Sequence, residues 1–164
     1  MTEIATSPCQ LPCDEVWRAI SKGSFLVLSF VNARGEPRSS GVVYATVRRH
    51  LYVVVQPDGC KARYIKDGQV VSVTVPVRKG GILSFLMPIP PATVSFHARA
   101  IVHAPGTLDP KSAAEYAPHH PEIARRTGCI IELVPEGQFL TYGIGVPLTR
   151  MTDPEAALRH APTS

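Results

Sequence analysis

Two cations just after a glycine form the most informative chemical group in this sequence. Lys61 and Arg63 follow Gly59, where an apolar β-branched run ends and a short helix is expected. Free backbone N–H groups at the start of a helix favour an anion, and neighbouring cations strengthen that preference. The pattern predicts a phosphate-binding corner, with an ordinary solvated helix face as the alternative.

Polar residues on an earlier segment are candidates to complete this corner. Ser39 and Ser40 offer hydroxyl donors, and Arg38 offers a further cation. Each also has a simpler interpretation, because polar side chains mark the solvated face of a strand. We expect Arg38, Ser39 and Ser40 to face the same anion as Lys61.

The elements that must position these residues are mostly strands. Apolar runs are separated by turn residues at 32–35, 48–50 and 57–59, which is typical of antiparallel meanders. Closure of such a sheet protects its edges. We therefore expect a mainly β fold, a split antiparallel β-barrel of Greek-key type with six to seven strands and small flanking helices. The expected strands are 25–31 (buried on both faces), 37–47, 51–55, 70–77 and 93–104, and then a hairpin of 129–134 and 138–144 around residues 135–137.

Short helices and loose ends complete the predicted architecture. Helices are expected at 14–22, capped by Asp14, at 109–117, and after Asp153. The chain then divides into a flexible N-terminal arm (1–13), one split-barrel domain (14–150), and a C-terminal helix and tail (151–164).

The apolar segment 78–91 holds too much proline for a central strand. We expect it at a subunit interface, as a lid over a flat ligand, or folded onto its own core.

Length and composition limit the class of protein. Of the 164 residues, 45% are hydrophobic and 18% are charged, which suits one packed domain. No apolar run reaches membrane-spanning length and no signal peptide is evident, so a cytoplasmic protein that binds no membrane is expected. The net charge of +4 is spread over loops without interleaved aromatic residues, which argues against nucleic-acid binding.

The cysteines and the common catalytic motifs give no further site. We expect reduced thiols and no metal, although a site made by Cys9 and Cys13 with His119 and His120 stays open as an alternative. No P-loop, dinucleotide fingerprint or nucleophile elbow is present. The remaining cysteines are Cys60 and Cys129.

The stretch from residue 25 to residue 77 contains the segments GEPRSSGVV and CKARYIKDGQVVSV towards its two ends. Its order of elements resembles that of a known family. Over residues 14–145 the order of elements is similar to the pyridoxamine 5'-phosphate oxidase-like superfamily of FMN-binding split β-barrels. The resemblance implies a flavin phosphate held by an Arg at the position of Ser40 and by a Ser-Arg-Lys run at residues 59–61. Only Lys61 survives from that set, and Arg38 and Arg63 are the nearest replacements.

The resemblance also implies main-chain contacts to the flavin ring. These contacts tolerate side-chain changes because backbone groups make them. Together with the phosphate candidates and Thr93, they give the predicted cofactor-binding set: Arg38, Ser39, Ser40, Gly41, Val42, Val43, Val54, Val55, Lys61, Arg63 and Thr93.

The implied function is a homodimeric, FMN-binding oxidoreductase acting on a small-molecule substrate. Pyridoxamine phosphate oxidases end with Arg-Leu-x-Pro, which the Gly143-Ile144-Gly145 end lacks, so formation of pyridoxal phosphate is not expected.

Three alternatives stay open: a deazaflavin coenzyme, haem, or a non-enzymatic module that binds a small molecule or partner. No acid or base stands out, which suits cofactor chemistry. Tyr44, His97 and His103 are expected to face a pocket, and His97, His103 or His119 would be the axial ligand of a haem.

Overall fold

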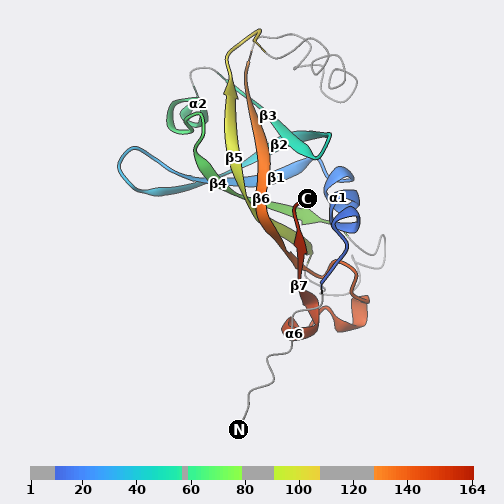
Figure 1. Cartoon of the computed structure of the whole chain (residues 1–164). Helices are drawn as coiled ribbons and strands as arrows, with labels where there is room; N and C mark the ends of the chain where they lie inside the picture. Colours follow the sequence, from blue (N-terminus) through green and yellow to red (C-terminus); the bar gives the residue numbers. More distant parts are fainter. Residues whose placement is uncertain (1–9, 57–58, 79–90, 108–127) are drawn as a thin grey trace.

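One antiparallel sheet dominates the computed structural model, which describes residues 10–56, 59–78, 91–107 and 128–164 (Figure 1). The strands are β1 (Phe25–Val31), β2 (Pro37–Val47), β3 (His50–Val55), β4 (Val70–Val77), β5 (Ala92–His103), β6 (Cys129–Tyr142) and β7 (Leu158–Pro162). The helices are α1 (Cys13–Ser21), α2 (Cys60–Tyr64), the 3-10 turn η1 (Leu148–Arg150) and α6 (Pro154–Ala157). The predicted helix 109–117 and the apolar segment 79–90 lie outside the described residues.

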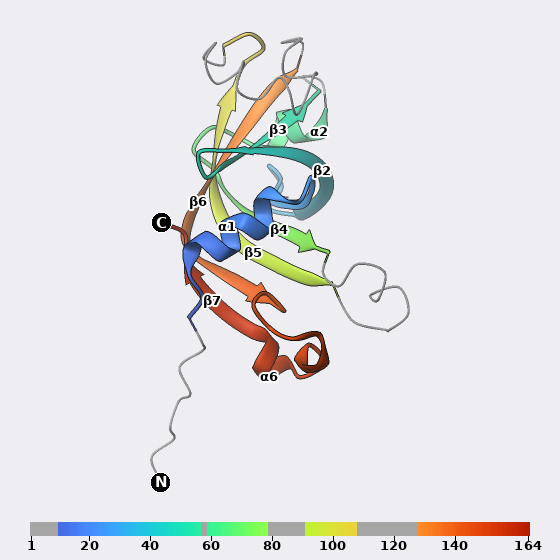
Figure 2. The ribbon, with the colours of Figure 1, turned by 90° about the vertical axis from the view of Figure 1, so that its right-hand side faces the viewer.

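The sheet closes into a barrel. Its strand order is β3-β2-β1-β4-β5-β6-β7, and an additional pairing of β3 with β6 joins the two ends of the six-stranded part. The pairings between named strands in the described part are all antiparallel, so the fold prediction is confirmed. The second half of β6 leaves the barrel and pairs with β7 instead (Figure 2).

The core lies inside this barrel and is sealed at one side by α1. Leu26, Leu28 and Phe30 of β1 point inward and are buried. The buried face of α1 adds Val16, Trp17 and Ile20 to the same cluster. This alternation of buried and exposed positions along the strands is the period-2 pattern of a sheet with one face on the core.

The prediction that β1 is buried on both faces was wrong. Phe25 and Val31 are 46% and 49% exposed, so the outward face of β1 lies open in the described part of the molecule. A continuous apolar run cannot by itself distinguish a doubly buried strand from one whose outward face meets another surface.

The predicted hairpin of 129–134 and 138–144 was also wrong, because β6 is one continuous strand. Pro135 and Gly137 fall where β6 has lost β3 as a neighbour and has not yet gained β7. The missing N–H of a proline is tolerated at such a gap. Gly137 has a positive φ of 77°, and the register with β5 shifts between Ser95 and His97, so a bulge replaces the expected turn.

The described parts of both chain ends pack against the barrel. Leu11, assigned to the flexible arm, is 5% exposed, and its N–H donates to the carbonyl of His160 at 2.8 Å. The residues predicted as a C-terminal tail form β7, because the second half of β6 offers them a free edge. The helix after Asp153 is confirmed, and the Asp153 side chain caps it.

Asp14 does not cap α1 as expected, since Pro12 occupies the N-cap and no side chain completes it. Asp14 instead forms an ion pair with Arg49 of the turn between β2 and β3, with an Nη2–Oδ1 distance of 2.5 Å.

Candidate functional site

The barrel opens where β2 and β3 separate. β2 pairs with β3 only from Tyr44 to Val47, and from Pro37 to Val43 its described partner is β1, on the opposite edge. On the other side of the opening, Val54 and Val55 of β3 pair with β6. The facing edges of β2 and β3 therefore have no strand partner among the described residues. Backbone N–H and C=O groups on these edges can therefore bind a ligand.

A cavity of about 700 Å³ occupies this opening. Its size is in the usual range for small-molecule sites, roughly 300–1,000 Å³. The walls come from the β1–β2 hairpin, the end of β3 and the start of α2, which lie at one end of the molecule (Figure 1). Of the predicted cofactor-binding residues, the cavity brings together Arg38, Ser39, Ser40, Val54, Val55 and Lys61.

The side chains of several predicted residues lie elsewhere, although the backbone of Gly41, Val42 and Val43, which was predicted to contact the ring, lies on the open edge of β2. Val42 is part of the barrel core and Val43 is 56% exposed on the outer face. A Cβ at Gly41 would lie 2.6 Å from the Phe25 ring, so that outer face is covered by an aromatic side chain. Thr93 pairs with Pro76 and Tyr142 and lines none of the described cavities. Arg63 lines a neighbouring hollow rather than this cavity.

The two cations of the cavity differ in their surroundings. Arg38 donates to Glu36 at an Nη2–Oε2 distance of 3.0 Å, and both side chains are exposed. Hydrogen bonds from Asn32 and Arg38 hold the pKa of Glu36 below its usual value. Lys61 is half-buried, and no carboxylate among the described residues pairs with it. Lys61 is therefore the cation of this cavity that an incoming anion can use without breaking an ion pair.

Asn32, which sequence reasoning missed, shapes one wall of the cavity. Its Oδ1 accepts the backbone N–H groups of Arg34 and Glu36 at 2.9 and 3.0 Å. Its Nδ2 donates to the Glu36 carboxylate at 2.9 Å. An asparagine that starts a turn between two apolar runs is the signal that could have identified it. The other lining residues missed by the sequence analysis are Phe30, Gln56 and Tyr64.

α2 brings Lys61 to the cavity through a tight corner. Gly59 is its N-cap, and a Cβ there would lie 3.1 Å from the Gln56 carbonyl oxygen, so a side chain would crowd the turn. Ile65, just past the helix, is 2% exposed and fixes the far end of α2 against the core.

A second polar cluster lies on the outward face of β3, β5 and β6. The Oε1 of Glu132 is 2.6 Å from both His50 Nδ1 and the Tyr52 hydroxyl, and Oε2 is 2.8 Å from His103 Nε2. Burial raises the pKa of Glu132, but the three hydrogen bonds outweigh it and the net pKa is lowered. His103 therefore meets a carboxylate rather than the cavity.

Tyr44 was also expected to face a pocket, but it does not. Its hydroxyl donates to the Ile20 carbonyl inside the core, and burial raises its pKa. His97 is exposed on the outer face opposite Ser72. The described residues include no cluster of ligating side chains suited to a metal ion, and Cys9, His119 and His120 lie outside them.

The residues of the cavity fit a phosphorylated planar cofactor. Unpaired strand edges can meet the polar edge of a flat ring, Phe30, Val54 and Val55 can contact its faces, and Lys61 can meet a phosphate. This combination of a few polar groups in a largely apolar cleft is what small cofactors require.

Solved structures with the same architecture identify the fold. HutZ, a haem storage protein from Vibrio cholerae, is 18% identical, with a TM-score of 0.63 over 80% of this chain and 94% of that chain. An FAD-binding protein from Mesorhizobium loti is 18% identical (TM-score 0.57, 77% and 89% covered). A putative pyridoxamine 5'-phosphate oxidase from Listeria innocua is 15% identical (TM-score 0.53, 76% and 93% covered). The chain has the split-barrel fold of the pyridoxamine 5'-phosphate oxidase-like proteins.

The split-barrel fold does not by itself determine the ligand. The neighbours include flavin-binding and haem-binding proteins, and one fold supports many functions. No protein-family model matches the chain, and no curated protein matches it in sequence. No described helix is both long and apolar enough to span a bilayer.

Proposed function

We propose that this protein is an oxidoreductase that binds a flavin in the opening between β2 and β3 and acts on a small-molecule substrate. The observation that carries this proposal is the coincidence of two unpaired strand edges with Lys61 around one cavity. The resemblance in sequence implies FMN, and the cavity is proposed to hold the flavin ring and the phosphate nearest to it.

In this proposal the chain binds and orients the cofactor, which supplies hydride transfer when it is bound. Lys61 contacts the phosphate from the start of α2, with Ser40 and the Gly59 corner beside it. The backbone edges of β2 and β3 fix the polar side of the ring. Phe30 and Val55, both buried, keep water from its apolar side.

Formation of pyridoxal phosphate is not part of the proposal. The segment after β6 contains Ile144 and Val146, which are 5% and 2% exposed and belong to the core. Residues 143–147, which directly follow β6, include no arginine, so the Arg-Leu-x-Pro end of a pyridoxamine phosphate oxidase is missing here.

A deazaflavin coenzyme is the nearest alternative cofactor. Only one of the family's charged phosphate contacts is kept, and Arg38 already pairs with Glu36. A ligand that relies less on one tightly held phosphate fits such a site as well as FMN does.

Haem is a second alternative, favoured by a specific observation. HutZ is described as a haem storage protein, and a neighbour from Mycobacterium smegmatis is described as haem-binding. His50 and His103 each use one ring nitrogen to contact Glu132, which leaves the other nitrogen for a metal. A carboxylate behind a histidine is the usual support of a metal ligand.

We also propose that the protein acts as a homodimer. The outward faces of β1 and β4 carry no charged residue, although a solvated sheet face normally does. Depletion of charge marks the core of an interface, and hydroxyl groups can donate and accept across a two-fold axis. The face consists of Phe25, Val27, Ser29, Val31, Val70, Ser72, Thr74 and Pro76.

An absorbance spectrum separates these proposals. A flavoprotein should purify yellow or bind added FMN stoichiometrically, with free flavin released on denaturation. A deazaflavin protein should bind only the added deazaflavin coenzyme, and a haem protein should give a Soret band. A protein that takes up none of the three would contradict the proposed function and favour a non-enzymatic binding module.

A further inference from the structure

A second hollow adjoins the cavity between β2 and β3, and it has no role in the proposed function. It has a volume of about 300 Å³ and shares Asn32 and Tyr64 with the larger cavity. The two hollows therefore meet along one wall, and a single elongated ligand can reach both. Tyr64, which is 37% exposed, lines both hollows.

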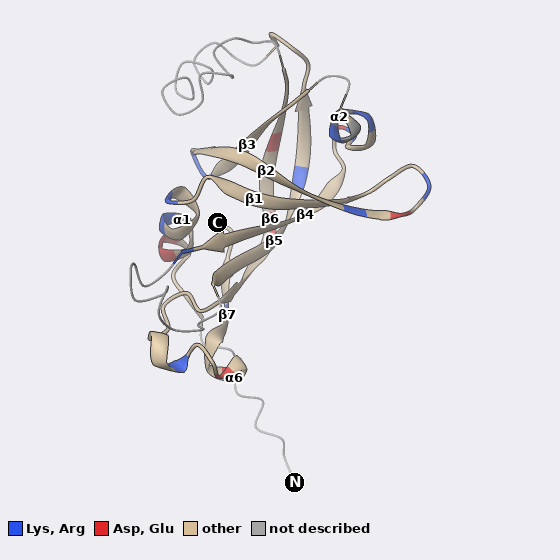
Figure 3. Ribbon diagram, turned by 180° about the vertical axis from the view of Figure 1, so that it is seen from behind, with Lys and Arg blue, Asp and Glu red and all other residues tan. Residues whose placement is uncertain are grey.

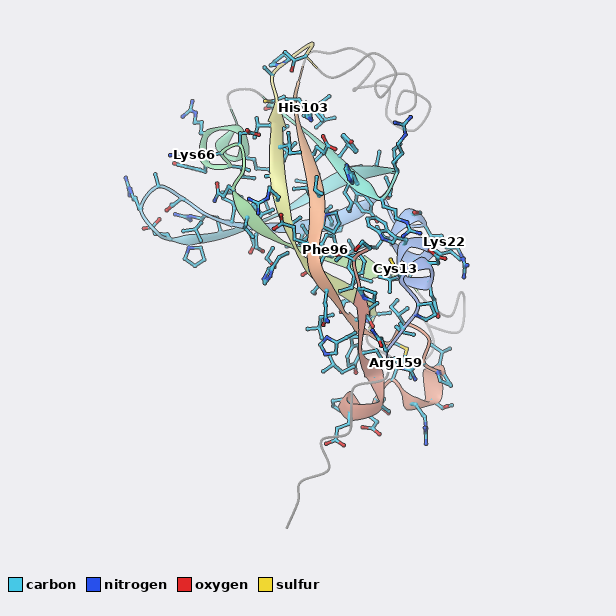
Figure 4. All side chains as sticks on the ribbon, in the orientation of Figure 1. Cys13, Lys22, Lys66, Phe96, His103 and Arg159 are labelled. Atoms are coloured by element: carbon cyan, nitrogen blue, oxygen red, sulfur yellow. The ribbon has the colours of Figure 1, made fainter. Side chains whose placement is uncertain are left out.

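The second hollow is cationic. Arg63 and Lys66 both line it, and no carboxylate in the described ranges pairs with either side chain. The nearby Asp67 is already used, since its Oδ1 accepts the backbone N–H of Val102 at 2.9 Å. Figure 3 shows the positive charge of α2, and Figure 4 labels Lys66 beside that helix.

Hydrogen bonds of the Gln69 side chain hold the other wall of this hollow in place. The Gln69 Oε1 accepts the backbone N–H of Lys66 at 3.0 Å, and its Nε2 donates to the Val31 carbonyl at 3.3 Å. Gln69 thereby joins the end of β1 to the segment after α2, and it holds Lys66 beside the hollow.

The helical geometry of α2 explains the two separate cationic positions. Successive residues of an α-helix are rotated by about 100°, so Lys61 and Arg63 point to nearly opposite sides of the helix. Lys61 lines the first cavity and Arg63 the second. One anionic group cannot engage both of them at close range.

We propose that the cofactor is longer than a mononucleotide and carries at least two separated anionic groups. Its ring and first phosphate occupy the larger cavity at Lys61, and a second anionic group lies in the smaller hollow at Arg63 and Lys66. A dinucleotide flavin and a deazaflavin coenzyme with an acidic tail share this chemistry. The inference rests on the proposed function, because it assumes a flavin-type ring in the first cavity.

The test compares long and short forms of the same ring by titration at low ionic strength. The pairs are FAD against FMN, and the deazaflavin coenzyme against a form without its acidic tail. The double variant Arg63→Gln/Lys66→Gln should lose about 3- to 20-fold in affinity for the long form, as expected for two exposed ion pairs. Affinity for the short form should stay within about twofold. The matched control Arg18→Gln/Arg150→Gln removes two exposed charges elsewhere and should change neither.

The possible outcomes distinguish a failure of this inference from a failure of the proposed function. A selective loss for FAD assigns a dinucleotide flavin, and a selective loss for the tailed deazaflavin assigns that coenzyme; either result supports the inference. Equal affinity of each long and short pair, or an equal loss for both in the double variant, would overturn the inference and leave the proposed function standing. Binding of none of the four by the parent protein would overturn both.

Discussion

At the scale of single residues, the decisive contrast lies between cations that are already paired and cations that are not. Arg38 and Arg49 each contact a carboxylate, whereas Lys61, Arg63 and Lys66 lie around the two hollows without one in the described residues. An exposed ion pair contributes little to stability, about 0–1 kcal/mol, but it reduces the attraction of its cation for a ligand. The unpaired cations are therefore the better candidates for binding an anion.

Glu132 gives a residue-scale prediction on stability. Its pKa is lowered in the folded protein, so its ionised form stabilises the fold fully above the unfolded value of 4.5, and this contribution is lost as the pH falls through the lower folded value. Glu132→Gln should therefore reduce the free energy of unfolding at pH 7 by about 1–2 kcal/mol, and the difference from the parent protein should shrink as the pH falls from 6 towards 3.

Urea denaturation of both proteins across this pH range measures the effect. Glu155→Gln, at an exposed carboxylate in α6, is the matched control and should show a much smaller difference at every pH. A difference between Glu132→Gln and the parent protein that is constant with pH would contradict the role assigned to the ionised carboxylate.

At the scale of elements, the long strand β6 holds the barrel together through its three neighbours. Its first half pairs with β3, its second half pairs with β7, and β5 runs beside both. The change of partner occurs around Pro135 and Gly137, which explains why residues typical of turns stand inside a strand.

The bulge gives an element-scale prediction. Gly137 has a φ of 77°, and a Cβ added there would meet no other atom within 4 Å, so Gly137→Ala adds backbone strain without a clash. The left-handed conformation costs a residue with a side chain about 1–2 kcal/mol, which for a chain of this length lowers Tm by about 2–8 °C. Thermal unfolding should show this loss, and Gln138→Ala, at the exposed neighbouring position, should show much less. A Tm unchanged in Gly137→Ala would contradict the bulge.

Elements with a strong period-2 pattern could be predicted from the sequence, and partnerships between distant segments could not. The bounds of β1, β2 and β4 are confirmed residue for residue. β6 and β7 were misassigned because proline and glycine are common both in turns and at bulges, and because β7 is a strand only beside the free edge of β6.

In the candidate site, too, contacts between distant segments could not be predicted from the sequence. The cations and serines of the cavity could be predicted because they stand at element boundaries. The Glu132 cluster could not, since residues 50, 52, 103 and 132 meet only through the registers of β3, β5 and β6.

At the scale of the whole molecule, the uncharged outer face of β1 and β4 predicts how two copies associate. Ser72 is exposed in the middle of this face, so Ser72→Arg should place like charges against each other across a two-fold axis without disturbing the fold. Light scattering at micromolar concentration should show a dimer for the parent protein and a monomer for Ser72→Arg. Thr152→Arg, at an exposed position after η1, should remain dimeric.

A monomeric parent protein would contradict the homodimer. If Ser72→Arg is instead as fully dimeric as the parent protein, two copies associate through another surface and the face assigned here is wrong.

The central claim is that the opening between β2 and β3 binds a phosphorylated flavin or deazaflavin through Lys61, and one titration tests it most directly. The parent protein, Lys61→Ala and the control Arg150→Ala are titrated with FMN and with the deazaflavin coenzyme. Lys61→Ala should weaken binding of the preferred cofactor by about 1–3 kcal/mol, or roughly five- to 150-fold, while Arg150→Ala matches the parent protein. If Lys61→Ala binds each cofactor as tightly as the parent protein does, the phosphate does not lie at Lys61 and the account of this site is wrong.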